Sequence, residues 1–230
     1  MTKIFAHRGL HLRETENTVA SFLEARSLGV DGVELDIRRT RDGALVVHHD
    51  AEIAGVGTIA GRDCRDLPRG TATLAEALLA CQGLVVNVEI KNSPGEPGYD
   101  PSDALAHQVV DEINELAWAD HVIISSFDLP TCEAVRSASG TMLVGWLLDW
   151  KLDTLTSVQR AADAGLNAVH PHFRRTDLHG IAAARQMAIA VNVWTVNEPG
   201  DIERMLDLGV DSIISDDPGL ALERVSARNA

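Results

Sequence analysis

The stretch A-R-S-L-G-V-D-G-V-E-L-D (residues 25–36) passes from the end of an amphipathic segment through Gly29 into a short apolar run. Glycine readily closes a helix, and a run such as Gly32–Ile37 is typical of a strand buried on both faces. Two later segments, A-D-A-G-L-N-A-V-H-P (162–171) and M-L-D-L-G-V-D-S-I-I-S-D (205–216), have the same form. A helix that leads through glycine into a buried strand is therefore repeated, and this predicts an α/β fold.

The rest of the chain alternates in the same way between short β-rich runs and longer amphipathic stretches. Most of the β-rich runs consist of Val, Ile, Leu and Ala, as expected for parallel strands that are covered on both faces. The predicted strands are Lys3–His7, Gly32–Ile37, Leu84–Ile90, His121–Ser125, Met142–Leu147, Asn167–His170, Ala190–Val196 and Ser212–Ser215. The predicted helices are Thr18–Leu28, Thr73–Ala80, Ser102–Ala117, Leu129–Ser137, Leu155–Ala164, Asp177–Gln186, Pro199–Leu208 and Asp217–Ala227.

Eight such βα units in 230 residues match a closed (β/α)8 TIM barrel near the small end of its size range. An open, doubly wound sheet is the main alternative, but the chain has neither a G-x-G-x-x-G motif nor a Walker loop, which weakens it. The helix ends agree with these assignments. Asn17 and Asp128 are suitable N-caps, and Gly29, Gly165 and Gly209 are suitable closing residues.

One further strand, Leu45–His49, is expected beside the second barrel strand. The turn R-D-G-A (41–44) precedes it, and D-G is a strong hairpin signal. The segment Asp50–Ala72 that follows is predicted to be irregular. No linker, low-complexity tract or charge block interrupts the chain, so residues 1–230 are predicted to form a single domain.

The acidic balance of the chain limits the kinds of partner it can bind. Lys and Arg number 20 and Asp and Glu 34, which gives a net charge of −14 and argues against binding nucleic acid or anionic lipid. An anionic substrate then requires a local cluster of cations. Arg8, Lys91 and a bound metal are the candidates.

The cysteines and the N-terminus suggest a cytoplasmic protein. Cys64, Cys81 and Cys132 are odd in number and show neither metal-site nor C-x-x-C spacing, so we expect reduced thiols. A predicted strand begins within a few residues of Met1, without a basic and apolar leader before it. No run of about 18 apolar residues is present, so no stable membrane association is expected.

Chemically active side chains stand where several predicted strands end. In a (β/α)8 barrel these ends meet at one face, where active sites are built. Residues two apart on a strand share a face, so Glu34 lies beside Asp36 and Glu89 beside Lys91. The candidate residues of the first three strands and the hairpin are His7, Arg8, Glu34, Asp36, His49, Glu89 and Lys91.

The three carboxylates predict a metal site. Glu34, Asp36 and Glu89 supply hard oxygen ligands, which suit Mg²⁺ or Ca²⁺ better than Zn²⁺. Three like charges in one pocket repel one another, and one divalent cation would remove that cost. Two flanking histidines could divide general-acid and general-base duty, while Arg8 and Lys91 are suited to phosphate oxygens. Together these groups indicate phosphoester cleavage.

Short motifs follow one another in a specific order along nearly the whole chain. They are His7-Arg8-Gly9, Glu16-Asn17-Thr18, G-V-E-L-D (32–36), T-R-D-G (40–43), V-H-H-D (47–50), E-I-K (89–91), S-S-F-D (125–128), V-N-V-W-T-V-N (191–197) and G-V-D-S-I-I-S-D-D-P (209–218). In this order the chain resembles the glycerophosphodiester phosphodiesterase family, one of the phosphatidylinositol-phospholipase-C-like phosphodiesterase barrels.

The resemblance implies a divalent-metal-dependent phosphoric diester hydrolase that releases glycerol 3-phosphate and an alcohol. The family mechanism has the 2-hydroxyl of glycerol attack phosphorus, which gives a cyclic phosphate that water then opens. By position, the resemblance implies His7 and His49 as the acid–base pair, Glu34, Asp36 and Glu89 as metal ligands, and Arg8, Lys91, Phe127 and Trp194 as substrate-binding residues. Glu16 is predicted to serve partly as a helix-capping group and partly as a supporting residue behind the site.

The chain departs from the family pattern in two places. Thr15 stands where the family usually has proline, which suggests a looser first loop. The segment after Asp50 is short where many members carry an insertion, so broader tolerance of the alcohol is expected. A lysophospholipase D-type enzyme acting on lysolipids and a non-catalytic barrel that binds a phosphorylated metabolite are the alternatives. The choice of Mg²⁺ or Ca²⁺, the alcohol, the histidine that acts first as base and the oligomeric state stay open.

Overall fold

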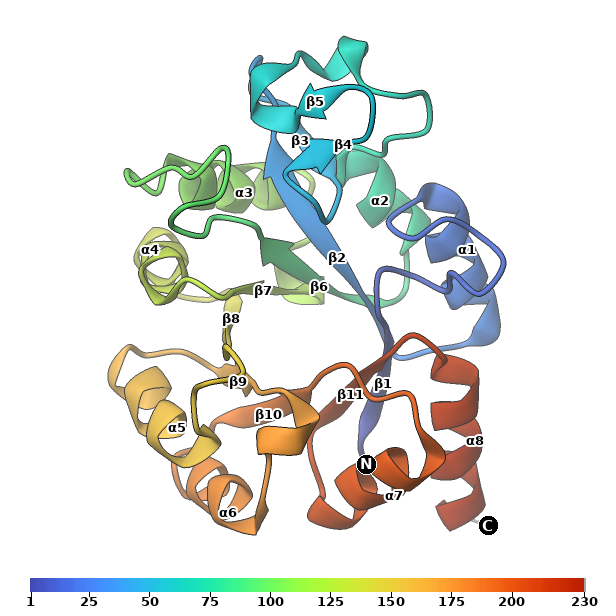
Figure 1. Cartoon of the computed structure of the whole chain (residues 1–230). Helices are drawn as coiled ribbons and strands as arrows, with labels where there is room; N and C mark the ends of the chain where they lie inside the picture. The colour runs from blue at the N-terminus through green and yellow to red at the C-terminus, as the bar shows by residue number, and fades with distance from the viewer. Residues whose placement is uncertain (230) are drawn as a thin grey trace.

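The computed structural model describes residues 1–229 and shows a closed ring of eight parallel strands with helices around it (Figure 1). The ring closes because the first strand pairs with both the second and the last. This confirms the predicted (β/α)8 barrel and excludes the open sheet. The barrel strands are β1 (Lys3–Ala6), β2 (Gly32–Arg39), β6 (Val85–Ile90), β7 (Val122–Ser126), β8 (Leu143–Leu147), β9 (Ala168–His170), β10 (Ala190–Val193) and β11 (Ser212–Ser215).

The predicted helices are all found, and their ends differ from the prediction by at most two residues. Each packs its apolar face on the outside of the strands. No helix within residues 1–229 is long and apolar enough to cross a bilayer. The helices are α1 (Val19–Leu28), α2 (Leu74–Ala80), α3 (Ala104–Glu115), α4 (Leu129–Ala138), α5 (Thr154–Asp163), α6 (Leu178–Gln186), α7 (Pro199–Leu208) and α8 (Pro218–Asn229).

The N-cap of α1 is Thr18, so the prediction of Asn17 was wrong by one residue. The Thr18 hydroxyl accepts from the Ser21 N–H at 3.2 Å, and the Ser21 hydroxyl accepts from the Thr18 N–H at 3.2 Å. Asn17 takes a left-handed conformation with φ 57° and is buried inside the molecule instead. Both residue types cap helices well, but Thr18 has the extended backbone of an N-cap, with φ −120° and ψ 156°, and Asn17 does not. The predicted cap Asp128 is confirmed, because its carboxylate accepts from the Thr131 N–H at 3.1 Å.

The hairpin after β2 is confirmed, although its second strand is shorter than predicted. β3 (Leu45–Val47) runs antiparallel to the end of β2. The following segment is not irregular throughout, since β4 (Glu52–Ile53) pairs with β5 (Gly57–Thr58) and two 3₁₀ turns follow. Strands of two residues are too short to leave a periodic pattern. In Figure 1 these strands stand out from one side of the barrel, at the top of the view.

The strands separate an apolar layer from a polar interior. On β2, Val33, Leu35 and Ile37 are fully buried in the apolar cluster shared with the helices. The alternate residues Glu34 and Asp36 are also buried, because successive side chains of a strand point to opposite faces. Other polar residues buried on the barrel strands include Asn87, Glu89, Ser125, His170, Asn192 and Ser212.

Part of this interior is a hydrogen-bonded structural network. Asn192 contacts His170 through its amide nitrogen and Nε2 at 2.9 Å, and accepts from the Ser212 hydroxyl at 2.7 Å. Burial lowers the pKa of His170 to about 3, so this ring is neutral. The ring fits against β8 because residue 145 is glycine: a Cβ there would lie 2.3 Å from Nε2 of His170.

We predict that Gly145→Ala destabilises the protein by about 1–3 kcal/mol, the usual cost of overfilling a packed interior. The His170 ring cannot withdraw without losing its bond to Asn192. Urea unfolding would measure the change, with Gly140→Ala as the control because no atom lies within 4 Å of a Cβ at position 140. Equal midpoints for the two variants would contradict this account of the close approach.

Candidate active site

A cavity of about 110 Å³ opens where the carboxyl ends of the barrel strands meet. Of the ten predicted site residues, only Asp36 and Glu16 are not among those that line it; Asp36 contacts the lining cations, and Glu16 contacts Arg8. Asn87, Leu147 and Ile214 complete the lining, and the sequence analysis did not single them out. The predicted residues in the lining are His7, Arg8, Glu34, His49, Glu89, Lys91, Phe127 and Trp194.

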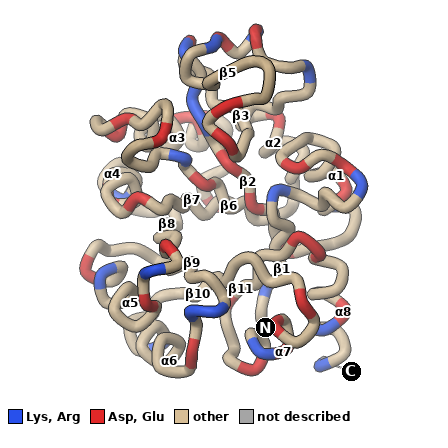
Figure 2. Tube along the Cα trace, viewed as in Figure 1, with Lys and Arg blue, Asp and Glu red and all other residues tan. Residues whose placement is uncertain are grey.

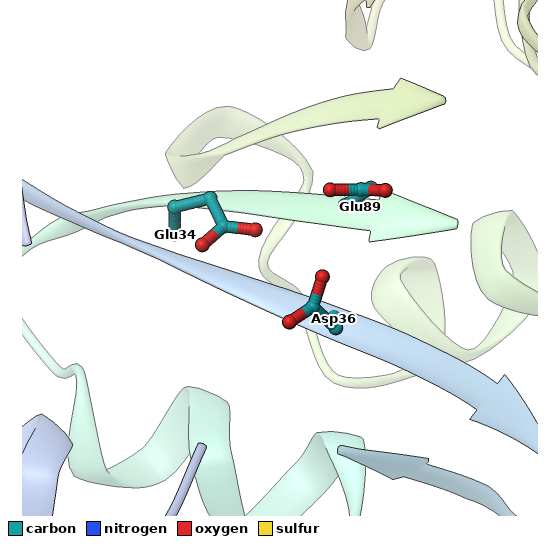
Figure 3. A group of neighbouring side chains, drawn as sticks. All are labelled: Glu34, Asp36 and Glu89. Carbon is teal, nitrogen blue, oxygen red and sulfur yellow. The ribbon is translucent and has the colours of Figure 1, made fainter. Parts of the chain in front are cut away.

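The three predicted carboxylates come together as a buried cluster. Glu34 and Asp36 lie two apart on β2, and the parallel register places Glu89 of β6 beside Asp36. One carboxylate oxygen from each lies within 4.8 Å of those of the other two. Figure 3 shows the three side chains facing one another across the two strands. The set offers the hard oxygen donors that a divalent cation requires.

Burial and repulsion give the three carboxyl groups unequal acidity. Burial, followed by the charge of Asp36, raises the pKa of Glu34 well above its usual value. The same two causes raise the pKa of Glu89 to about 7, although Lys91 acts against them. Burial also acts on Asp36, but Lys91 and Arg8 outweigh it and lower its pKa to about 2. Oε1 of Glu34 is buried without a hydrogen-bond partner among the described residues, which fits a group that awaits a cation.

Two cations stand against this cluster. The Lys91 Nζ lies 2.9 Å from Asp36 Oδ1 and 2.5 Å from Glu89 Oε1. Arg8 Nε lies 3.4 Å from Asp36 Oδ2, and its Nη1 donates to Glu16 at 2.8 Å. Acidic positions are spread over the whole chain, including β2 (Figure 2). Lys91 and Arg8 therefore supply local positive charge within an otherwise acidic protein.

The first loop ties the cluster to the rest of the fold. Arg8 has φ 54°, and its backbone N–H donates to Glu34 Oε2 at 3.1 Å. The amide of Asn17 donates to Asp36 Oδ2 at 2.7 Å. Asn17 is thus a site residue that the sequence analysis treated as a helix cap; its place in the E-N-T motif was the signal.

Both predicted histidines are oriented by a carboxylate. His7 Nδ1 lies 2.6 Å from Asp216 Oδ1, and His49 Nδ1 lies 2.7 Å from Asp50 Oδ1. Each contact leaves the ring's Nε2 free of that carboxylate, and His7 Nε2 lies 3.9 Å from Glu34. Burial, followed by the charge of Lys91, lowers the pKa of His49.

Further groups hold these contacts in place. The guanidinium of Arg38 donates to the His49 carbonyl through Nε at 2.8 Å and Nη2 at 2.6 Å. Asn197 donates to Asp216 Oδ2 at 2.7 Å and accepts from the Asp216 N–H at 2.9 Å. The sequence analysis gave no role to Arg38, Asn197 or Asp216. Asn197 lies in the motif V-N-V-W-T-V-N and Asp216 in G-V-D-S-I-I-S-D-D-P, and these positions are the sequence feature that could have indicated a role for them.

Part of the cavity lining is aromatic. Phe127 and Trp194 meet edge to face with ring centres 5.5 Å apart. The Trp194 indole donates to the His170 carbonyl at 2.7 Å, which fixes the ring. The Lys91 Nζ lies 5.9 Å from the centre of the Phe127 ring. The cavity is therefore lined by both charged and aromatic groups.

The model of the "Glycerophosphoryl diester phosphodiesterase family" matches residues 7–220. The chain belongs to this family. A probable glycerophosphodiester phosphodiesterase 1 of Mycobacterium tuberculosis is 45% identical over 94% of this chain and 89% of its own. A glycerophosphodiester phosphodiesterase of Caldanaerobacter subterraneus is 29% identical over 94% of this chain and 95% of its own. A solved putative member from Agrobacterium tumefaciens superposes with a TM-score of 0.89 at 23% identity, over 100% of both chains, and shares the fold.

We predict that, in EDTA, ionisation of Glu89 lowers the free energy of unfolding of this family member as pH rises from about 4.5 to about 7. The cause is Glu89, whose folded pKa of about 7 exceeds the ordinary value of 4.5, so the folded state binds the extra proton across this range. The pKa of Glu34 shifts in the same direction, whereas that of Asp36 shifts the other way but at lower pH. Burial lowers the pKa of His170 to about 3 and also lowers that of His49, so both histidines act against Glu89 in this range, and the effect of Glu89 is measured as a difference between the wild type and a Glu89 variant.

Thermal melts of the wild type and Glu89→Gln, at about pH 5 and about pH 8, would measure this effect. The variant should melt above the wild type at the higher pH in EDTA, and excess Mg²⁺ or Ca²⁺ should reverse the order. A difference between the two proteins that does not change with pH or cation would show that Glu89 is not an ionised member of the cluster.

Proposed function

We propose that the protein hydrolyses glycerophosphodiesters to glycerol 3-phosphate and an alcohol, with one divalent cation, Mg²⁺ or Ca²⁺. One observation carries the proposal: two cations and two carboxylate-paired histidines line one small cavity together with Glu34 and Glu89, two members of a cluster of three buried carboxylates. Membership of the family supports the reaction class. The substrate is a small molecule, since the cavity of about 110 Å³ suits a glycerol phosphate group.

Glu34, Asp36 and Glu89 would hold the cation. When bound, it would balance their charge and polarise the phosphoryl group. Arg8 offers a planar fork for two phosphate oxygens, and Lys91 offers a point charge. Burial acts to lower the pKa of Lys91, but Glu89 and Asp36 outweigh it, so the ammonium stays charged. Glu16 holds the Arg8 guanidinium from outside the cavity.

His7 and His49 would carry the protons. One imidazole takes the proton of the glycerol 2-hydroxyl as its oxygen bonds to phosphorus; the other protonates the alcohol oxygen as its bond to phosphorus breaks. The product of this step is a cyclic phosphate. Water then opens the ring with the two roles exchanged. Asp216 and Asp50, each on Nδ1, would keep both Nε2 atoms available. Phe127 and Trp194 would face the apolar parts of the substrate.

The cell compartment is proposed as the cytoplasm. Cys64, Cys81 and Cys132 are unpaired, which suits a reducing compartment. Burial raises the pKa of Cys81 to about 12, so this thiol is unreactive.

The first test is release of glycerol 3-phosphate from glycerophosphocholine and glycerophosphoethanolamine, in EDTA, Mg²⁺ or Ca²⁺. We expect metal-dependent release from the wild type and a loss of about 10²–10⁴-fold in His7→Ala and His49→Ala, the usual contribution of a general acid or base. His48→Ala is the matched control, because His48 adjoins His49 but does not line the cavity.

The alternatives predict other outcomes of the same assay. Turnover of lysolipids without turnover of the water-soluble diesters would indicate a lysophospholipase D-type enzyme. Binding of glycerol 3-phosphate without hydrolysis of any diester by the folded protein would indicate a binding barrel. Full activity in EDTA would count against the cation.

We predict that Asp216→Asn lowers kcat by about 10²–10⁴-fold, with a smaller effect on KM, because the amide can donate to Nδ1 and reverse the imidazole tautomer. Asp50→Asn should cost less, because the side chain of Asp50 is 74% exposed and water can replace it, whereas that of Asp216 is 35% exposed and held by Asn197. Steady-state kinetics would measure both. Equal losses in the two variants would refute this ranking.

A further inference from the structure

Asn87 is a buried side chain that the mechanism above does not use. It lies on β6 beside Glu34 in the parallel register, and it lines the cavity. Its exposed fraction is 1%. Among residues 1–229, neither Nδ2 nor Oδ1 of Asn87 has a hydrogen-bond partner. A buried carboxamide that forms no bond lowers stability, so its presence needs an explanation outside the resting fold.

Other buried asparagines of the chain are bonded at both amide atoms. Asn192, in the same barrel interior, contacts His170 and accepts from Ser212. Asn92 donates to the Asp100 carbonyl at 3.0 Å and accepts from the Asp100 N–H at 2.8 Å. Asn17 contacts Asp36 through both of its atoms. Asn87 differs from these three in having the cavity in front of it.

The surroundings of Asn87 indicate what it binds. The charged groups of the cavity suit a cation and a phosphate, whereas a carboxamide both donates and accepts and so complements a neutral hydroxyl. Ile214 and Leu147 line the same cavity, and their side chains have no polar atom. The lining residues with a polar side chain other than Arg, Lys or Glu are Asn87, Trp194 and the two histidines. The Trp194 N–H is already bonded to the His170 carbonyl, and the histidines have the catalytic role proposed above, so Asn87 remains available to bind a hydroxyl.

We propose that Asn87 binds the terminal hydroxyl of the glycerol group and so selects glycerol diesters over diesters of simpler diols. This inference rests on the proposed function and deepens it. The 2-hydroxyl is consumed in the reaction, while the terminal hydroxyl is free to be recognised. A site built to bond a hydroxyl rejects an analogue without it strongly, because its own polar group is then left unpaired.

The test compares glycerophosphocholine with the phosphocholine diester of propane-1,2-diol, which keeps the attacking hydroxyl and lacks the terminal one. We expect the wild type to prefer the glycerol diester by at least about a hundredfold in kcat/KM, and Asn87→Ala to prefer it by less than about threefold. Ser125→Ala is the control. Its hydroxyl is also buried and unpartnered, but it does not line the cavity, so the wild-type preference should remain.

A second measurement does not depend on turnover. Because Asn87 forms no bond in the protein, Asn87→Ala and the larger Asn87→Leu should melt no lower than the wild type in the absence of substrate. If the alanine variant fails to fold, the leucine variant serves for the kinetic comparison.

The outcomes separate the two proposals. Equal loss of kcat/KM on both diesters in Asn87→Ala, or a wild type without preference, would overturn the role of Asn87 and leave the reaction intact. If Asn87→Ala needs a higher cation concentration for activity than the wild type and keeps the preference for the glycerol diester, Asn87 is a metal-site residue. That result would overturn its role toward the hydroxyl. A wild type that hydrolyses neither diester would overturn the proposed function, and the role of Asn87 with it.

Discussion

The confinement of Glu34, Asp36 and Glu89 inside the barrel is the constraint on which the other contacts of the site depend. Three carboxylates within 4.8 Å repel one another and lose hydration, so the pKa values of Glu34 and Glu89 are raised. Lys91 and Arg8 compensate only in part, and chiefly at Asp36. The carboxylate cluster can therefore accept further positive charge, such as that of a divalent cation.

Groups from distant parts of the sequence hold this arrangement. The first loop donates two hydrogen bonds to the carboxylates of β2, one from the Arg8 backbone N–H to Glu34 and one from the Asn17 amide to Asp36. Arg38 fixes the backbone of His49, and Asp216, from the end of the last strand, orients His7. A parallel barrel brings these residues together because all of its strands end at the same face.

The division between the two faces of each strand explains how the fold tolerates such a site. Apolar side chains between strands and helices supply the stabilising burial, so the interior can hold polar groups that oppose it. His170, Asn192 and Ser212 use part of that interior for a satisfied network. Asn87 and the unpartnered Oε1 of Glu34 belong to residues that line the cavity.

The sequence alone determined the barrel, the positions of its strands and helices to within a few residues, and the convergence of His7, Arg8, Glu34, His49, Glu89, Lys91, Phe127 and Trp194 on one cavity. These follow from local periodicity and from motifs at strand ends, which depend on neighbours in the chain. Only the tertiary structure decided that Thr18 rather than Asn17 caps α1, that β4 and β5 form, that Asp216 meets His7, and that Asn87 has no partner. Those features depend on which side chains burial brings together across a separation of up to 209 residues, and no local pattern records that.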